Sequence, residues 1–408
     1  METIITDKIT FGGNCLAKIN GKNVFVPFAL PGEKLKVQIT QSKRDYDYAK
    51  IVDIIEPSEK RIKPICPLYE KCGGCNMMHV DYDFQKTLRK QILKECFERN
   101  EIRLNIEDIE VISGQNLNYR CRFQLTNGGL SARGSNTIVP VSECFCAVPE
   151  INEWLSKNEF SNRPKGRCHI FGCKNVISAG GDFSEKVALG LEAQKEEQNY
   201  AELKKKNKNI KQVKKRYSGT TLQPSDIVKI KLLEKEINFD VKGFFQSNIE
   251  VLEKSVQAIC SGLKGDSVLD MYAGCGTFSV FLADHFKELT LVEHNRDALV
   301  FAEMNLFGIK HNSVGLSSAK WAELNKNAYF DAVVIDPPRS GMEPEVRKWL
   351  CNSDIPQVRS VSCDPATHSR DIAQLLKSGY ELKKVYLLDF YPNTSHIESL
   401  AVLEKNIK

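Results

Sequence analysis

The spacing of hydrophobic residues changes along the chain and divides it into three parts. In residues 1–58, short apolar runs are separated by turn residues such as Pro31-Gly32, and Pro57-Ser58 ends the series. Five or so short strands in fewer than 60 residues predict a small closed barrel of the oligonucleotide-binding (OB) type. The clearest strands are expected at Asn23–Leu30, Lys34–Ile39 and Ala49–Ile55.

A helix is expected next, because the apolar residues between Asp83 and Arg99 recur at helical spacing. Residues 119–230 mix strand-like runs with polar loops, and their pattern does not define a fold. We therefore expect one central α+β domain at residues 59–240, between the barrel at 1–58 and a third domain at 241–408.

The third domain alternates buried strands with helix-like periodicity. This alternation predicts a parallel, doubly wound, Rossmann-like sheet, in which ligands bind at the carboxyl ends of the strands. The fold class is therefore multi-domain α/β, with the chemistry expected at that sheet edge. The strands are expected at Ser267–Met271, Leu289–Glu293, Ala332–Ile335 and Ser360–Ser362.

The composition is that of an ordinary globular protein: of 408 residues, 42% are apolar and 27% are charged. No apolar run approaches the roughly 18 residues that span a bilayer, and the first residues lack the basic start of a secretory signal. We therefore expect a cytoplasmic protein, and a monomer because no interface signal is seen. In a reducing compartment, 14 cysteines favour metal binding, catalysis or packing over disulfides.

The excess positive charge lies in one short segment. Eight Lys/Arg and no Asp or Glu lie between Lys204 and Arg216, and without them the chain holds 49 basic and 52 acidic residues. Such a run is either a solvated surface or an arm that contacts nucleic-acid phosphates, since clustered Lys and Arg bind nucleic acid by releasing counterions.

A glycine-rich turn at residues 270–276 follows the first strand of the third domain. Glycines at such a turn let the backbone approach a ligand closely. Glu293 ends the next strand, where a carboxylate can accept hydrogen bonds from a ribose diol. Because the turn lacks the third glycine of the dinucleotide fingerprint, we expect S-adenosylmethionine rather than NAD.

Asp336-Pro337-Pro338-Arg339 follows the strand at 332–335 and lies at the same sheet edge. Two prolines fix the backbone and remove two hydrogen-bond donors. The segment is either a plain strand-ending turn or a rigid one that holds Asp336 toward a cofactor or substrate.

Cys363 ends the next strand. Asp364 is a good helix N-cap and Pro365 a good first helical residue, so a helix is expected to begin there. A thiol at a helix N-terminus is more easily ionised, although the carboxylate of Asp364 opposes this unless it turns inward to cap. Cys363 is therefore either a packed cysteine or a nucleophile, and its place at the ligand edge favours the nucleophile.

His396 and Glu398 precede a final apolar strand at Ser399–Leu403. Glu398 is a candidate general base, and we assign His396 a structural or orienting role. A cysteine and a base are the parts needed for covalent methyl transfer to carbon 5 of a pyrimidine. Addition of a thiolate to carbon 6 makes carbon 5 nucleophilic, and a base then removes the hydrogen from carbon 5 so that the thiolate can leave.

A cysteine group lies in the central part of the chain. Cys66, Cys72 and Cys75 have a spacing that can hold a metal, and Cys144 or Cys146 can supply the fourth ligand. Four thiolates suit either a structural zinc or a four-iron cluster, and the spacing does not decide between them.

Taken together, these motifs resemble the RNA uridine-5-methyltransferase family. The resemblance covers nearly the whole chain: a TRAM-like barrel, the Cys-Gly-Gly-Cys block, the Phe-x-Gln-x-Asn-like segment at 245–248 and the four motifs of the third domain. It implies methylation of a uridine in 23S rRNA, since members with both barrel and cluster typically act there, with the T-loop uridine of tRNA as the alternative. RNA is thus the implied partner.

The resemblance also implies site residues and cofactors. The nucleophile is Cys363 and the base is Glu398. The S-adenosylmethionine contacts are Gln246, Tyr272, Thr277, Glu293 and Asp336, and the ligands of a [4Fe–4S] cluster are Cys66, Cys72, Cys75 and Cys144.

Two residues depart from the family pattern. Thr277 and Asp364 each stand where many members have Asn. A radical S-adenosylmethionine or electron-transfer protein is the competing class, but it requires a tighter cysteine triplet. A non-catalytic RNA-binding protein would require that Cys363 or Glu398 lie away from the site.

Overall fold

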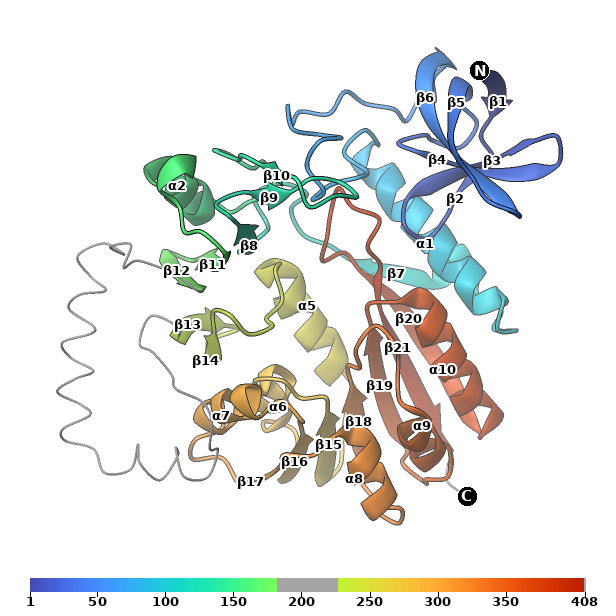
Figure 1. Cartoon of the computed structure of the whole chain (residues 1–408). Coiled ribbons are helices and arrows are strands. Elements are labelled where there is room, and N and C mark those ends of the chain that lie inside the picture. Colours follow the sequence, from blue (N-terminus) through green and yellow to red (C-terminus); the bar gives the residue numbers. More distant parts are fainter. Residues whose placement is uncertain (182–226, 407–408) are drawn as a thin grey trace.

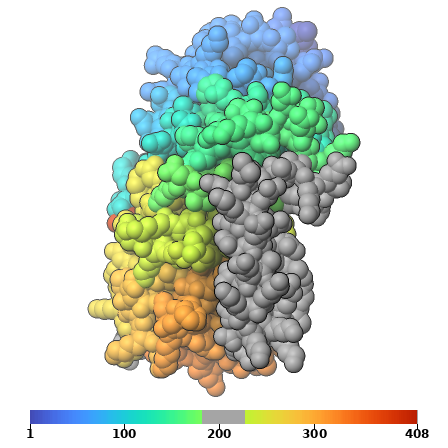
Figure 2. Space-filling model, turned by 90° about the vertical axis from the view of Figure 1, so that its left-hand side faces the viewer, coloured from blue at the N-terminus to red at the C-terminus, as the bar shows by residue number. Residues whose placement is uncertain are grey.

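The computed structural model describes residues 1–181 and 227–406, which form three regions stacked along one long axis (Figure 1). The barrel lies at one end, the central region follows, and the large sheet lies at the other end, an order that is also visible on the surface (Figure 2). The basic run from Lys204 to Arg216 lies outside the described residues. Among the helices of the described ranges, none combines the length and the apolar character needed to cross a membrane.

The N-terminal region is a curled six-stranded sheet with the order β1-β5-β6-β4-β3-β2. Its interior is apolar, with Val24, Val26, Leu35 and Val37 fully buried. The barrel was predicted to be closed, but β1 and β2 are the two edges of the sheet, so it is a half-barrel. The strands are β1 (Glu2–Ile5), β2 (Lys8–Ile9), β3 (Asn14–Ile19), β4 (Lys22–Pro27), β5 (Lys34–Ser42) and β6 (Tyr46–Glu56).

The predicted helix is α1 (Tyr82–Glu98), and the side chain of Asp81 caps it by accepting the N–H of Phe84. After a 3₁₀ turn, η1 (Ile106–Asp108), the chain enters β7 (Ile109–Ile112). β7 pairs in parallel with β20 (Tyr380–Leu388), and α1 packs against α10 (Pro365–Lys377). Both elements lie within the range expected for the central domain, yet they complete the large C-terminal sheet.

The rest of the central region is built from small sheets. Strands β12, β11 and β8 form an antiparallel sheet, while β9 with β10 and β13 with β14 form hairpins. The elements are β8 (Arg122–Thr126), β9 (Leu130–Ser131), β10 (Ile138–Val139), α2 (Pro149–Lys157), η2 (Phe160–Asn162), β11 (Arg167–Cys173), β12 (Val176–Gly181), β13 (Ile227–Leu232) and β14 (Lys235–Asp240).

The C-terminal sheet has eight strands in the order β17-β16-β15-β18-β19-β21-β20-β7. It is parallel from β17 to β19, as predicted, but β21 runs antiparallel to both neighbours, because the short loop after β20 cannot make the crossover that a parallel strand requires. Its remaining elements are α5 (Ile249–Cys260), β15 (Ser267–Met271), α6 (Thr277–Leu282), β16 (Glu288–Val292), α7 (Arg296–Asn305), β17 (His311–Val314), α8 (Ser318–Leu324), β18 (Ala332–Ile335), α9 (Pro344–Cys351), β19 (Gln357–Ser362) and β21 (Glu398–Lys405).

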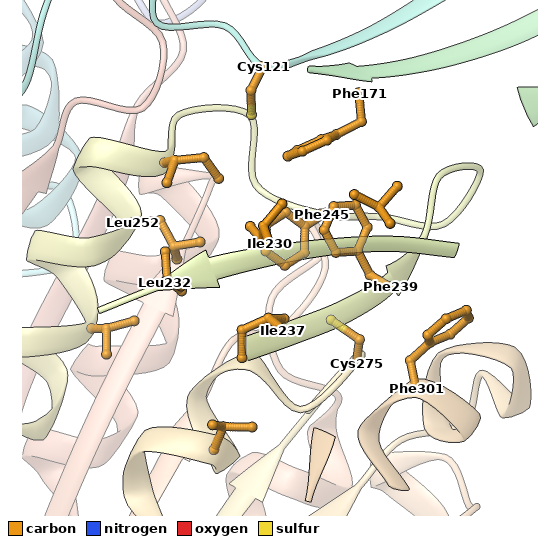
Figure 3. Close-up of a cluster of buried hydrophobic side chains, with 14 of the residues drawn as sticks. Cys121, Phe171, Ile230, Leu232, Ile237, Phe239, Phe245, Leu252, Cys275 and Phe301 are labelled. Atoms are coloured by element: carbon orange, nitrogen blue, oxygen red, sulfur yellow. The ribbon is translucent and has the colours of Figure 1, made fainter. Parts of the chain in front are cut away.

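Helices cover both faces of this sheet, because alternate residues of each strand point to opposite sides. Val268 of β15 packs into a core with α5, α6 and α7, whereas Leu269 packs into the core formed with α1, α8, α9 and α10. A cluster of aromatic and aliphatic side chains continues the first core into the central region (Figure 3). Within it, the rings of Phe239 and Phe245 stack with their centroids 3.9 Å apart, so the β13–β14 hairpin is fixed to the sheet.

Candidate active site

A cavity of about 1040 Å³ opens at the carboxyl ends of β15, β16, β18 and β19. This is the edge at which doubly wound sheets bind ligands. It brings together residues that are far apart in the sequence. Those already singled out that line it are Gln246, Tyr272, Gly274, Glu293, Asp336, Arg339, Cys363, His396 and Glu398.

The glycine-rich turn holds the carboxylate of Glu293. The backbone N–H of Gly274 donates to Glu293 Oε2 at 2.9 Å, and that of Asn295 donates to Oε1 at 2.6 Å. Gly276 has φ of +78°, and a Cβ there would lie 3.1 Å from the Cβ of Ala302, so glycine is required on both counts. The Oε2 atom keeps a second lone pair that can accept a bond from a ribose hydroxyl, while Oε1 also lies 3.1 Å from Nδ1 of His294.

Gln246 and Tyr272 both line the cavity. The Oε1 atom of Gln246 is buried and has no hydrogen-bond partner among the described residues, an arrangement that costs free energy unless a ligand supplies a donor. The hydroxyl of Tyr272 donates to the carboxylate of Glu343. The hydroxyl of Thr277 lies 3.3 Å from the thiol of Cys275 and the residue is not among those that line the cavity, so its cofactor contact stays a prediction.

Two buried carboxyl groups lie near the carboxyl ends of β15 and β18, and that of Asp336 lines the cavity. Burial raises the pKa of Asp270 to about 6, although its Oδ2 accepts a bond from the hydroxyl of Ser279 at 2.5 Å. Burial, together with the charge of Asp270, raises the pKa of Asp336 to about 7. Asp270 was not predicted as a site residue, since a carboxylate inside a strand gives no signal of this coupling.

Cys363 lies immediately after β19, at the start of α10. As predicted, Asp364 caps this helix: its Oδ1 accepts the N–H groups of Ala366 at 3.0 Å and Thr367 at 2.9 Å. The expected ease of ionisation is wrong, because burial, followed by the charges of Glu398 and Asp336, raises the pKa of Cys363 to about 11. These forces outweigh the field of the helix terminus.

Glu398 is the first residue of β21 and is only 5% exposed. Burial and the charge of Asp336 raise its pKa to about 8, against the opposing effect of Arg339. His396 lies on the cavity wall with its ring centroid 5.5 Å from that of Tyr391, and burial with Arg339 and Arg120 lowers the pKa of His396. It is therefore neutral near pH 7, in keeping with an orienting role.

Arg120 is a cavity residue that the sequence reasoning missed. It lines the large cavity and also a second one of about 400 Å³, so the two cavities share a wall, to which Gly73 and Gly74 contribute as well. The only sequence signal was the repeated arginine in Tyr-Arg-Cys-Arg at 119–122, which does not distinguish a cavity wall from a surface.

The second cavity gathers the predicted cysteine ligands. Cys66, Cys72, Cys75, Cys144 and Cys146 all line it. The sulfur atoms of Cys75 and Cys146 lie 3.7 Å apart. No group of three or more candidate ligands in the described ranges converges on a single ion position.

Two family profiles match this chain. One describes the TRAM domain and matches residues 1–52, and the other describes a tRNA (uracil-5-)-methyltransferase and matches residues 317–406. A Treponema denticola protein named as an uncharacterized RNA methyltransferase is 36% identical, with 99% of each chain covered. The chain belongs to the RNA uracil-5-methyltransferase family. As a member, it is an S-adenosylmethionine-dependent RNA methyltransferase with a TRAM domain.

Other relatives of this methyltransferase carry more specific names. A Photobacterium profundum protein named as a 23S rRNA (uracil(1939)-C(5))-methyltransferase is 29% identical, covering 99% of this chain and 94% of that protein. The crystal structure of a Pyrococcus abyssi tRNA (uracil-54, C5)-methyltransferase with S-adenosyl-L-homocysteine matches 98% of this chain and 99% of its own, with a TM-score of 0.71 and 19% identity. That likeness shows the shared class I methyltransferase fold.

Proposed function

We propose that this methyltransferase forms 5-methyluridine in 23S rRNA through a covalent bond between Cys363 and the uracil ring. One observation carries the proposal: Cys363, Asp336 and Glu398 line the same cavity as the glycine-rich turn and Glu293. A nucleophile, a base and a cofactor cradle are therefore within reach of one bound nucleotide. A flipped-out base can enter such a cavity, as enzymes that act on bases in folded nucleic acid require.

S-adenosylmethionine would supply an electrophilic methyl group at this site. Gln246 fits it, because the unpartnered Oε1 can accept a bond from the cofactor. Glu293, fixed by two backbone amides, would take the ribose hydroxyls, while Tyr272 and Asp336 would border the remaining groups. The role predicted for Thr277 finds no support in the lining of the cavity.

Cys363 acts in the first half of the proposed reaction, and Glu398 acts in the second. After the thiol loses its proton to water, the sulfur of Cys363 bonds to carbon 6 and the ring becomes an enolate. Carbon 5 can then bond to the methyl group, while the bond between that methyl and the sulfonium sulfur would break and leave a neutral thioether. In the second half, Glu398 takes the hydrogen of carbon 5, the carbon–sulfur bond breaks, and the thiolate leaves. A carboxyl group with a pKa of about 8 keeps its proton in most molecules near neutral pH, so Glu398 acts as the base from its ionised fraction, which grows as the pH rises toward 8.

A trapping experiment tests the covalent step. RNA that contains 5-fluorouridine keeps fluorine where the base must remove hydrogen, so the methylated adduct cannot resolve. We expect a stable protein–RNA band on a denaturing gel for the wild type and for Cys351→Ala, which removes a half-buried thiol at the end of α9. Cys363→Ala should give none. An enzyme that methylates ordinary RNA but forms no adduct would refute the covalent role of Cys363.

The uridine of the tRNA T-loop is the second candidate substrate. It is favoured by the name of the family profile that matches residues 317–406, whereas the rRNA assignment is supported by the TRAM domain and the relatives at about 29% identity. Competition decides between them: unmodified 23S rRNA and tRNA transcripts are methylated together, and the ratio of the two kcat/KM values gives the preference. A ratio in favour of tRNA would overturn the rRNA assignment.

The cysteine cavity fits a [4Fe–4S] cluster held by Cys66, Cys72, Cys75 and Cys144. Each thiolate of such a cluster binds a different iron, so the ligands surround a volume, which agrees with cysteines spread over the wall of the cavity. Cys144 is proposed as the fourth ligand because it lines the same cavity as Cys66 and Cys72, with Cys146 as the alternative. Iron and sulfide analysis after anaerobic purification tests this: Cys144→Ala should lose iron, whereas Cys168→Ala, at a buried packing position, should retain it.

A further inference from the structure

Three regions of the chain meet at the side chain of Asn76, directly after Cys75. Its Oδ1 accepts the backbone N–H of Ser395 at 2.8 Å, and its Nδ2 donates to the hydroxyl of Ser395 at 2.9 Å. The same Nδ2 donates to the carbonyl of Gly12 in the N-terminal barrel at 3.2 Å. One amide side chain therefore joins the barrel and the cysteine segment to the loop that leads into β21.

The backbone next to Asn76 holds this loop as well. The N–H groups of Asn76 and Met77 both donate to the carbonyl of Asn393, at 3.1 and 3.0 Å. Asn393 is 3% exposed and has φ of +64°, a left-handed conformation that a non-glycine residue keeps only when its surroundings hold it. The cysteine segment is thus part of what holds the loop in shape.

The barrel packs closely against Asn76 and Ser395. A Cβ on Gly13 would lie 2.6 Å from Asn76 Nδ2 and 2.8 Å from the Cβ of Ser395. Contacts this short cannot form, so the close approach of the barrel depends on glycine at this position and on the present orientation of Asn76.

The earlier part of the loop is held by the same half of the chain. Asp389 forms a buried ion pair with Arg89 at 2.7 Å and accepts a bond from the hydroxyl of Tyr82 at 2.8 Å. The hydroxyl of Tyr119 donates to the carbonyl of Pro392 at 2.8 Å. From 389 to 395, the loop is therefore anchored on residues from the first third of the chain, and Glu398 follows only three residues later.

We propose that Asn76 is a positioning residue for the proton-removal step, which it serves by holding Ser395 and thereby the start of β21 at Glu398. The inference rests on the proposed function, because it takes Glu398 to be the base. It gives the cysteine segment and the barrel a defined part in the reaction: they hold the loop that leads to the base, whereas Glu398 itself pairs with Leu388 in the C-terminal sheet.

The proposal makes the effect of Asn76 specific to one half of the reaction. Bond formation by Cys363 and methyl transfer do not require Glu398 to be in place, but removal of the hydrogen from carbon 5 does. Loss of the Asn76 contacts should therefore slow the breakdown of the methylated adduct and leave its formation near the wild-type rate.

The experiment compares Asn76→Ala with Asn100→Ala in the full-length protein. Asn100 is a matched control, because its Nδ2 also donates to a serine hydroxyl of the catalytic domain, that of Ser369 at 2.8 Å, but away from the loop. With ordinary uridine RNA, Asn76→Ala should accumulate the methylated adduct on a denaturing gel and lower kcat at least about tenfold, with little change in KM for S-adenosylmethionine. Asn100→Ala should do neither.

A milder variant and a double variant keep the outcome decisive. Ser395→Ala removes the hydroxyl acceptor but leaves the backbone bond to Asn76, and should accumulate adduct to a smaller extent. Adding Asn76→Ala to Glu398→Gln should change adduct breakdown no further. If Asn76→Ala instead weakens RNA binding or slows adduct formation, or behaves as wild type, the positioning role is refuted. If Glu398→Gln itself accumulates no adduct, it is the proposed function that fails.

Discussion

The raised pKa of Glu398 predicts that this residue destabilises the fold at the pH at which the enzyme works. In the unfolded chain its carboxyl group ionises near the ordinary value of 4.5, but in the folded protein it ionises near 8, because burial and Asp336 disfavour the charge. Between these two pH values, unfolding releases a proton that the folded state retains. The contribution of Glu398 to the stability of the folded state is therefore fully present below pH 4.5 and is lost as the pH rises toward 8.

The magnitude follows from the width of this window. Each pH unit changes the free energy of unfolding by 1.36 kcal/mol where the carboxyl group is ionised in one state and protonated in the other. The stability lost is therefore about 3 kcal/mol at pH 7 and about 4 kcal/mol at pH 8. At pH 5 it is about 1 kcal/mol. Since Gln has the same shape and does not ionise, Glu398→Gln should raise the free energy of unfolding by these amounts, a large part of the stability of a typical domain.

Urea unfolding at pH 5 and pH 8 measures the effect. Trp321 and Trp349 lie in the core of the C-terminal sheet and report on its unfolding by fluorescence. Glu404→Gln is the matched control, because Glu404 lies on the same strand but is exposed, so it should change little at either pH. A stabilisation by Glu398→Gln that is equal at both pH values, or absent at pH 8, would show that the carboxyl group does not titrate as described.

Four further predictions concern other parts of the molecule. Cys363→Ala should abolish methylation but leave S-adenosylmethionine binding unchanged in calorimetry, since the thiol is not part of the cofactor cradle. Gly276→Ala should weaken cofactor binding in the same assay and cost about 1 kcal/mol in urea unfolding, because φ is +78° and Ala302 is close. Phe239→Ala should lower the free energy of unfolding by about 3–5 kcal/mol, as the ring is 1% exposed and stacked on Phe245; an effect below 1 kcal/mol would contradict the packing argument. Cys75→Ser should lower the iron content and also accumulate adduct with ordinary RNA, because Asn76 is its neighbour; normal turnover without iron would refute the link.

The sequence predicted most of the catalytic sheet because its signals are local. Each strand is a buried apolar run, and the cap at Asp364 and the turn at Gly274–Gly276 are encoded within a few residues. The antiparallel direction of β21 was not predicted, since strand direction depends on how the preceding loop returns. The entry of β7 into the sheet was missed for the same reason: a four-residue strand from the first half of the chain carries no mark of its distant partner.

The residues of the candidate site also divide into those with a local signal in the sequence and those without one. Cys363, Glu398, Glu293 and Asp336 were predicted, because each stands at the end of a recognisable strand. The pKa of Cys363 was predicted in the wrong direction, since a helix terminus can be read from sequence but the approach of two carboxyl groups from other strands cannot. Arg120 and Asn76 were missed because their roles arise only where separate regions meet.

The pairing of β7 with β20 also has a consequence for how the protein is made. The strand that pairs with β7, β20, is synthesised some 270 residues later. Until then, β7 and α1 remain exposed to solvent, because their packing partners do not yet exist. A ribosome-bound chain that stops before β20 would hold an unpaired strand edge and an uncovered apolar helix face, a state that invites aggregation or chaperone binding. For the same reason, residues 241–408 expressed alone would lack one edge of their sheet and one helix of its cover, and the catalytic half is not a unit that can be exchanged between proteins.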